Sequence, residues 1–156
     1  MFEAPPTIVT VAEQHTAVIR LDIARSAMQA EMGPAIGELM RELAAQQLRP
    51  AGPLFSRHFA MHPDRFSFEV GVPVAATVAP GRRMQASTLP AGRVARAVLE
   101  GDYAGLANGW AGLLGWVQAH GFATRPDFWE VYVTGPEASP DPAAWRTQLN
   151  KPLKEL

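Results

Sequence analysis

The alternation of apolar and polar residues divides the chain into short strands and two amphipathic helices. β-Branched and aliphatic residues at 7–12 and 17–23 are typical of strands. Further strands are expected near 54–60, 66–74 and 84–88. Between them, apolar residues recur every three or four positions, which indicates a helix that buries one face. Pro34 fits the first turn of this helix. The stripe consists of Met32, Ile36, Leu39, Met40 and Leu43.

The second half of the chain repeats this order. A strand near 93–99 precedes Asp102, which can cap the N-terminus of a second helix. Gly121 suits the C-terminal end of that helix. Strands near 127–133 and 145–150 follow. The apolar stripe of the second helix consists of Tyr103, Leu106, Trp110, Leu113, Leu114 and Val117.

The two halves align at one offset of 74 residues, which places Ile36 on Trp110 and His58 on Tyr132. The preceding strands, VIR at 18–20 and VAR at 94–96, match at an offset two residues longer. A helix and a following strand that stay in register favour a duplicated strand–helix–strand–strand unit over two unrelated segments of similar size.

We therefore expect an α+β fold with internal repeats at about 15–80 and 91–153, within a single domain that spans 1–156. Each unit would carry an antiparallel sheet covered by one helix. Two such units related by a pseudo-two-fold axis would form a ligand cleft, and small-molecule sites tend to form in such places.

Composition excludes several classes of protein. Apolar residues make up 47% of the chain and charged residues 19%, which excludes a disordered chain. A net charge of -1 gives no basic field for nucleic acid, and no apolar run reaches the roughly 18 residues of a membrane span. The absence of cysteine excludes disulfides and thiolate metal sites. With no signal segment visible, we expect a cytoplasmic protein that contacts neither nucleic acid nor membrane directly.

The stretch FWEVYV at 128–133 has the composition of an internal strand, but it contains a glutamate. Side chains alternate along a strand, so Phe128, Glu130 and Tyr132 share one face. Trp129, Val131 and Val133 share the other. We expect the purely apolar face to pack against the helices and the face with Glu130 to line the cleft.

Glu130 has two readings. It can lie on a solvated strand face or pair with an arginine, as most strand glutamates do. Between Phe128 and Tyr132, however, an ionised carboxylate loses hydration and must find a cation or donor, or raise its pKa. A bound organic cation would supply the missing charge, and aromatic faces would add cation–π attraction.

For His58 and Trp110, both a structural and a functional interpretation stay open. His58 is either an ordinary hydrogen-bonded strand residue or part of a pocket. His62 follows four residues later, but on a strand this spacing places the rings roughly 13 Å apart, so we expect no metal site. Trp110 is either a core residue or a pocket wall.

Five segments carry a family resemblance: GPLFSRHF at 52–59, FEVGVPV at 68–74, LPAGRVARAVLEGDYAGLANGWAGLLGWVQAHG, FWEVYVTGP and WRTQLNKPL. Together they resemble the GyrI-like family, the effector-binding domain of many bacterial AraC-type and MerR-type multidrug regulators. The resemblance implies a tandem repeat of the strand–helix–strand–strand unit. It also implies that Glu130 lies in an aromatic pocket and contacts cationic, hydrophobic ligands without a cofactor or metal. Phe128, Tyr132, His58 and Trp110 are the other expected ligand contacts.

The sequence departs from the family pattern where His58 replaces a frequent tyrosine and where Gly101-Asp102-Tyr103 replaces Gly-Pro-Tyr. The histidine can share a proton with Glu130, which would change the preferred charge of the ligand.

The resemblance leaves three functions open. The first is a stand-alone module that binds hydrophobic, often cationic, aromatic molecules. The second is a hydrolase that opens cyclopropane rings of DNA-alkylating natural products, with Glu130 activating water and Tyr132 assisting. The third is interaction with a protein partner of unknown identity. Only about a dozen residues precede the first repeat, so we expect no helix-turn-helix in this chain.

Overall fold

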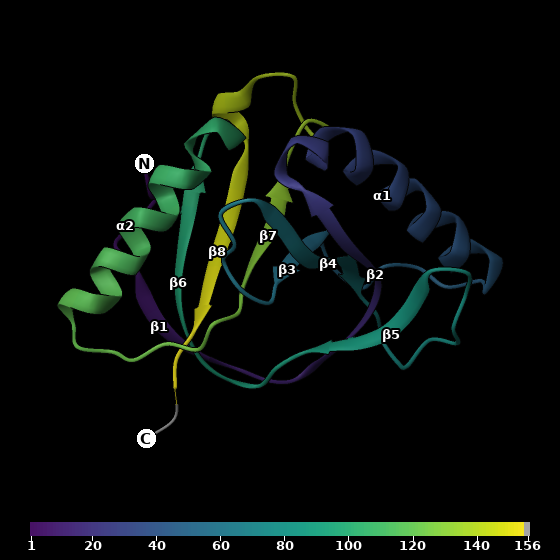
Figure 1. Ribbon diagram of the computed structural model, residues 1–156, viewed down its shortest axis with the longest axis horizontal. Coiled ribbons are helices and arrows are strands. Elements are labelled where there is room, and N and C mark those ends of the chain that lie inside the picture. The colour runs from purple at the N-terminus through teal and green to yellow at the C-terminus, as the bar shows by residue number, and fades with distance from the viewer. Residues whose placement is uncertain (155–156) are drawn as a thin grey trace. The chain divides into compact units, whose positions relative to one another are not determined.

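The structure is a computed structural model that describes residues 1–154. The chain divides into two compact units, which are described separately (Figure 1). The early unit is Ala12–Ala91, and the late unit combines Met1–Val11 with Gly92–Leu156. No helix in the described part of the chain is long and apolar enough to cross a membrane.

The early unit is a four-stranded antiparallel sheet with one long helix on one face (Figure 1). Its elements are β2 (Gln14–Ala24), α1 (Met28–Ala45), β3 (Phe55–His58), β4 (Arg65–Pro73) and β5 (Met84–Leu89), with the strands in the order β3-β4-β2-β5. Helix α1 packs on β2 and β4, where Leu39, Leu43 and Ala35 meet Ile19 and Val70 in one buried core.

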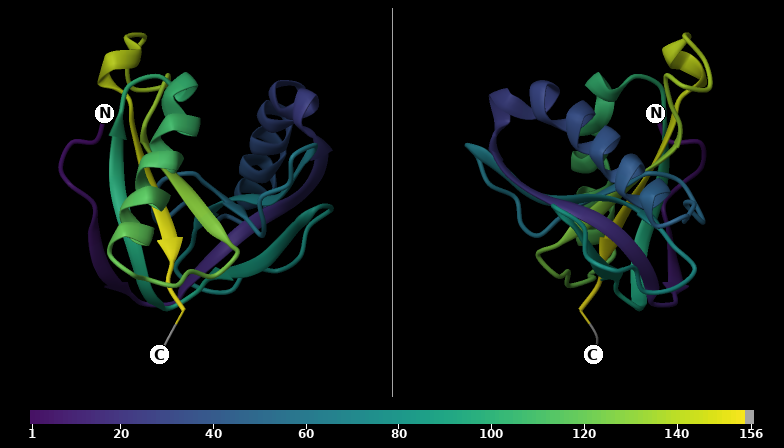
Figure 2. Two further views of the ribbon diagram at one scale, coloured as in Figure 1. Left: turned by 60° about the vertical axis from the view of Figure 1, so that its left-hand side comes forward. Right: turned by 90° about the vertical axis from the view of Figure 1, so that its right-hand side faces the viewer.

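The late unit has the same plan. Its elements are β1 (Thr7–Val11), β6 (Gly92–Glu100), α2 (Leu106–Ala119), β7 (Phe128–Thr134) and β8 (Arg146–Pro152), with the strands in the order β7-β8-β6-β1. Helix α2 runs along β6 and β8 (Figure 2), and its Leu113 and Val117 pack on Ala97 and Leu149. Asp102 caps the short turn before this helix by accepting a hydrogen bond from the Ala104 amide at 3.0 Å.

The equivalence of the two units extends to individual positions. The buried residues Ala35, Leu39 and Leu43 of α1 have Gly109, Leu113 and Val117 of α2 as counterparts, all at the predicted offset of 74 residues. The α+β class and the antiparallel sheets are therefore confirmed. Common ancestry of the two halves, and the cleft between them, stay predictions.

The predicted alignment of the preceding strands is wrong by two residues. In the early unit, one row across β3, β4 and β2 consists of Ser56, Val70 and Ile19. In the late unit, the corresponding row across β7, β8 and β6 consists of Glu130, Leu149 and Ala97. With β3 placed on β7, Ile19 falls on Ala97, an offset of 78 residues rather than 76. A slip of two residues keeps every side chain on its own face, so the apolar pattern does not detect it.

Two expectations about α1 also differ from the structure. Pro34 lies inside the helix rather than in its first turn, because the helix already begins at Met28. The earlier start lets Met28 and Met32 join the core beneath the helix. Met40, which the periodicity places in the buried stripe, is 36% exposed.

Candidate functional site

Glu130 lies on the helix-facing side of its sheet, opposite to the predicted side. It is directly opposite Leu149 in the register, and Leu149 belongs to the core beneath α2. Phe128 on the same face packs against Trp110 of that helix, with ring centroids 4.8 Å apart. The predicted orientation is wrong because α2 supplies a hydrogen-bond donor on this side, which allows a carboxylate to be buried there.

Both oxygens of the Glu130 carboxylate accept a hydrogen bond. The indole Nε1–H of Trp110 donates to Oε2 at 2.6 Å, and the Tyr132 hydroxyl donates to Oε1 at 2.9 Å. An indole N–H can only donate, so it fixes Oε2 as an acceptor. The side chain is only 8% exposed, which excludes the reading of a solvated strand residue.

The environment of Glu130 acts on its pKa in two directions. Burial raises the pKa of the carboxyl, and the hydrogen bonds from Trp110 and Tyr132 lower it less. Among the ion pairs of residues 1–154, none joins Glu130 to an arginine or lysine. The carboxylate is therefore held by two neutral donors that orient it without cancelling its charge.

Aromatic rings extend from Glu130 along the late unit. Beyond Tyr132 lies Tyr103, with ring centroids 5.8 Å apart in an edge-on arrangement. Trp145 follows Tyr103 at 5.0 Å. Sequence reasoning did not include Tyr103 and Trp145 in the site, although Tyr103 lies in the Gly101-Asp102-Tyr103 motif. The two residues precede α2 and β8 respectively, and the fold brings them together.

Two buried polar groups lie close to the aromatic rings. Lys151 Nζ lies 5.6 Å from the centroid of Phe128 and donates to the Asp127 carbonyl at 3.1 Å. Burial lowers the pKa of this lysine, and the nearby Asp127 carboxylate opposes that change. Thr147 is directly opposite Tyr132, is 1% exposed, and its hydroxyl has no hydrogen-bond partner in the described part of the chain.

His58 belongs to the early unit, where it occupies the position equivalent to Tyr132. Its ring stacks on Phe68 at 4.8 Å and meets the edge of Phe66 at 5.6 Å. The Ser56 hydroxyl lies 3.4 Å from Nε2. Burial, with a smaller contribution from the Arg25 charge, lowers the pKa of His58 to about 4, so the imidazole is neutral at pH 7. Proton sharing between His58 and Glu130 stays a prediction.

Comparison with known proteins places this architecture in a family. The model of the GyrI-like small molecule binding domain matches residues 4–154. The chain belongs to the GyrI-like family. A search of curated protein sequences finds no match.

Solved structures share the GyrI-like fold at low sequence identity. The C-terminal domain of EcmrR is 17% identical with a TM-score of 0.81, and the match covers 97% of this chain and 98% of that domain. EcmrR is also solved in a DNA complex, where the match at 18% identity and a TM-score of 0.85 covers 97% of this chain and 58% of the EcmrR chain.

Two further solved structures share this fold. A hydrolase from Listeria innocua is 11% identical with a TM-score of 0.73, over 98% of this chain and 93% of the hydrolase. SAV2435, solved with bound tetraphenylphosphonium, is 12% identical with a TM-score of 0.68, over 97% of this chain and 94% of SAV2435. At these identities the likeness establishes the fold.

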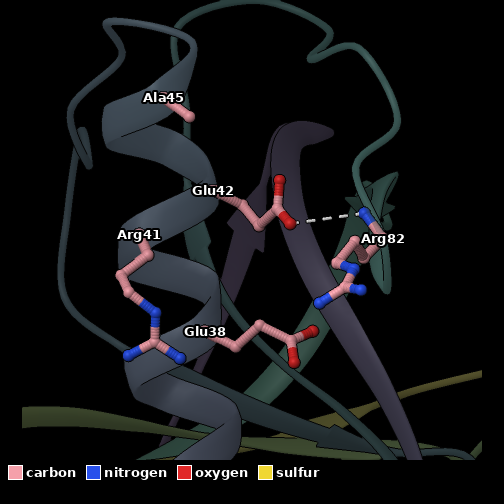
Figure 3. A pocket seen from close by; sticks show the side chains of 5 residues that line it. All are labelled: Glu38, Arg41, Glu42, Ala45 and Arg82. Carbon is pink, nitrogen blue, oxygen red and sulfur yellow. Dashed lines mark hydrogen bonds between the residues drawn. The ribbon is translucent and has the colours of Figure 1, made fainter.

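The GyrI-like domain also has a charged pocket of about 300 Å³ in its early unit (Figure 3). Two carboxylates and two guanidinium groups line it. Glu38 already pairs with Arg83 at 2.9 Å, and Glu42 accepts a hydrogen bond from the Arg82 amide at 3.4 Å. These contacts tie the loop before β5 to α1, so a structural role accounts for the pocket. Within residues 1–154, no group of three His, Asp or Glu side chains is placed to hold a metal ion.

Proposed function

We propose that this GyrI-like domain binds hydrophobic, cationic aromatic small molecules at Glu130. The observation that carries the proposal is the state of the carboxylate. It is buried, both oxygens are held by neutral donors, and it has no ion-pair partner among the described contacts.

The physical reason is the cost of a buried charge. Removing a carboxylate from water costs several kcal/mol unless it is paired, and two neutral donors compensate only part of that cost. A ligand with a positive charge near Glu130 would supply the missing partner. Flat aromatic faces beside the acid would add about 0.5–2 kcal/mol each by cation–π attraction.

Phe128, Tyr132 and Trp110 are the proposed aromatic contacts of the ligand in the late unit. Tyr132 is half-buried, so the residue is not fully enclosed by the protein. His58 stays a predicted ligand contact within the early unit, where its ring packs against Phe66 and Phe68. Its low pKa leaves it uncharged at pH 7, so it would not repel a cation.

Tetraphenylphosphonium is a suitable probe, because SAV2435 carries this lipophilic cation in a related fold. We expect the wild-type protein to bind it and Glu130→Gln to lose about 10- to 100-fold in affinity, which corresponds to removing one buried charge pair. Triphenylphosphine oxide, a neutral aryl phosphorus compound, should bind wild type and Glu130→Gln equally. Calorimetric titration gives both affinities.

Glu31→Gln is the matched control, since it removes an exposed carboxylate from α1. Circular dichroism establishes that each variant is folded before it is titrated. Equal affinity of wild type and Glu130→Gln for the cation would refute the proposed role of Glu130. Failure of the wild type to bind the cation would refute the proposed ligand class.

A second candidate is hydrolysis of cyclopropane rings, with Glu130 as the base that activates water. One observation favours it: burial raises the pKa of Glu130, and a general base at neutral pH requires a change in this direction. Mass spectrometry of a cyclopropane-bearing alkylator incubated with the protein would detect gain of one water. Gain that requires Glu130 favours the enzyme, whereas unchanged substrate with Glu130-dependent binding favours the binding module.

A further inference from the structure

A second carboxylate, that of Glu137, lies close to the aromatic residues beside Glu130. These residues are Tyr132, which contacts Glu130, and Tyr103, which contacts Tyr132. Glu137 is exposed, and it lies two residues after the buried Gly135. A β-carbon on Gly135 would lie 2.7 Å from the Tyr103 hydroxyl and 2.8 Å from Glu137 Oε2. Both groups therefore crowd the same small space, and the absence of a side chain at Gly135 permits this approach.

Tyr103 lies between the two acids. Its ring is 5.8 Å from that of Tyr132, whose hydroxyl donates to Glu130. Burial raises the pKa of Tyr103, and the carboxylates of Glu137 and then Glu130 raise it further. The Tyr103 hydroxyl thus feels the field of both carboxylates, one buried and one exposed.

The loop that carries Glu137 is held in place at several points. Its backbone turns at Gly135, whose carbonyl accepts a hydrogen bond from the Ala138 amide at 2.9 Å. The Trp145 indole donates to the Ser139 carbonyl at 2.9 Å, and the Thr134 hydroxyl donates to the Ala144 carbonyl at 3.1 Å. These bonds fix the loop on the same tryptophan that borders Tyr103.

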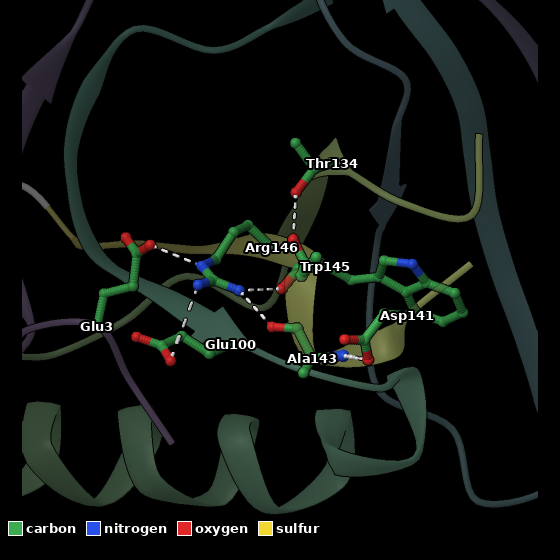
Figure 4. Close-up of polar contacts among 8 residues, drawn as sticks. Glu3, Glu100, Thr134, Asp141, Ala143, Trp145 and Arg146 are labelled. Carbon is green, nitrogen blue, oxygen red and sulfur yellow. Dashed lines mark hydrogen bonds and ion pairs between the residues drawn. The ribbon is translucent and has the colours of Figure 1, made fainter. Parts of the chain in front are cut away.

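Arg146 lies at the end of this loop, and its guanidinium group interacts with residues other than Glu137 (Figure 4). Its guanidinium donates to the Ala143 carbonyl and pairs with Glu3 at 2.7 Å and with Glu100 at 3.9 Å. Among the ion pairs of residues 1–154, none involves Glu137. The exposed carboxylate is therefore not matched by a protein cation within the described contacts.

We propose that the site selects aromatic dications, with one charge near Glu130, the ring system along Tyr132 and Tyr103, and a second charge near Glu137. This inference rests on the proposed function and specifies its ligand class. The buried acid would set whether a cation binds, and the exposed acid would favour a cation that carries a second charge on a flexible arm.

Ethidium and propidium form a matched pair of probes, because they share a phenanthridinium ring and propidium adds a quaternary ammonium on a side arm. Both can be titrated by fluorescence at low and at physiological salt. We expect the wild type to prefer propidium by about threefold at low salt, since an exposed charge pair is worth at most about fivefold in affinity. The preference should shrink as salt is added.

Glu137→Gln should abolish this preference and leave ethidium affinity unchanged, while the exposed Glu31→Gln should keep the preference. Because Glu137 is exposed, its replacement should not prevent folding. Equal affinity of the wild type for the two dyes, or an unchanged preference in Glu137→Gln, would overturn the inference.

The proposed function is judged separately by Glu130→Gln with ethidium alone. Loss of ethidium binding together with a preference that ignores Glu137 would refute the dication inference and leave the proposed function standing. Failure of both dyes to bind the wild type would refute both.

Discussion

The two units differ in the residues that they carry at equivalent positions of the strand and the covering helix. In the late unit, a carboxylate at Glu130 meets an indole donor from Trp110 of the helix. In the early unit, the equivalent residues are Ser56 on the strand and Ile36 on the helix, and Ile36 offers no donor. In this chain the acid is buried where the covering helix supplies a hydrogen-bond donor, and the equivalent position without such a donor carries a serine.

The largest effect is expected when a carboxylate is introduced at the equivalent position of the early unit. Ser56→Glu would bury a carboxylate where the covering helix has Ile36 instead of an indole donor, and where a polar neighbour is the neutral His58 imidazole, 3.4 Å from the Ser56 hydroxyl. We expect it to lower the free energy of unfolding by about 3–5 kcal/mol at pH 7, the cost of an uncompensated buried charge. Urea denaturation measures the change.

Ser56→Gln separates size from charge in that experiment. It adds the same volume without the negative charge, so it should be less destabilising than Ser56→Glu at pH 7. The two variants should converge at pH 4, where the introduced carboxyl is protonated. Equal instability of both at every pH would mean that crowding alone explains the effect.

The next largest effect concerns the pH dependence of stability, where the buried groups of the two units act in opposite directions. The pKa of His58 falls from 6.5 to about 4 on folding, so its contribution is present above pH 6.5 and is lost as the pH falls toward 4. The pKa of Glu130 is raised, so its contribution is present below pH 4.5 and is lost as the pH rises through the folded value.

His58→Asn isolates the first of these contributions. Between pH 6.5 and pH 4 the wild type should lose at most about 3 kcal/mol of unfolding free energy that the variant does not lose. Urea denaturation at half-unit pH steps gives the two curves, with the exposed His15→Asn as control. Parallel curves for wild type and His58→Asn would contradict the burial of a neutral imidazole.

A smaller effect is expected when the donor to Glu130 is removed. Trp110→Phe keeps an aromatic ring but leaves Oε2 without its hydrogen bond, which should cost about 2 kcal/mol of unfolding free energy. In a Glu130→Gln background the cost should shrink, because a bond to a charged acceptor is worth more than a bond to a neutral one. Trp116→Phe on the same helix is the matched control. Additive costs in this double-mutant cycle would show that the bond contributes nothing specific.

The sequence predicted the elements well because each strand and helix carries its own local signal. It did not predict which face of β7 meets the helix. Trp129 on the opposite face is 3% exposed and Glu130 is 8% exposed, so both faces of that strand are buried. When both faces are buried, polarity along the strand no longer identifies the core side. The donor on Trp110, distant in sequence, decides the orientation.

The outer part of the site could not be predicted for a related reason. Tyr103, Glu137 and Trp145 come from three separate segments, and no local pattern in these segments indicates that the three residues meet in space. Gly135 brings two of them together through a close approach that no periodicity encodes. In contrast, Glu130 could be singled out because a charged residue within an apolar strand is unusual on its own.

The most direct test of the claim that Glu130 binds the charge of the ligand is to titrate the Glu130 carboxyl itself. Carbon-13 NMR of the Glu130 side-chain carboxyl, assigned with Glu130→Gln, would report its pKa in the free protein and at saturating tetraphenylphosphonium. We predict a value above 4.5 in the free protein and a clear fall when the cation binds, because a nearby positive charge favours the ionised form. An identical pKa in both states would contradict the claim that Glu130 binds the charge of the ligand.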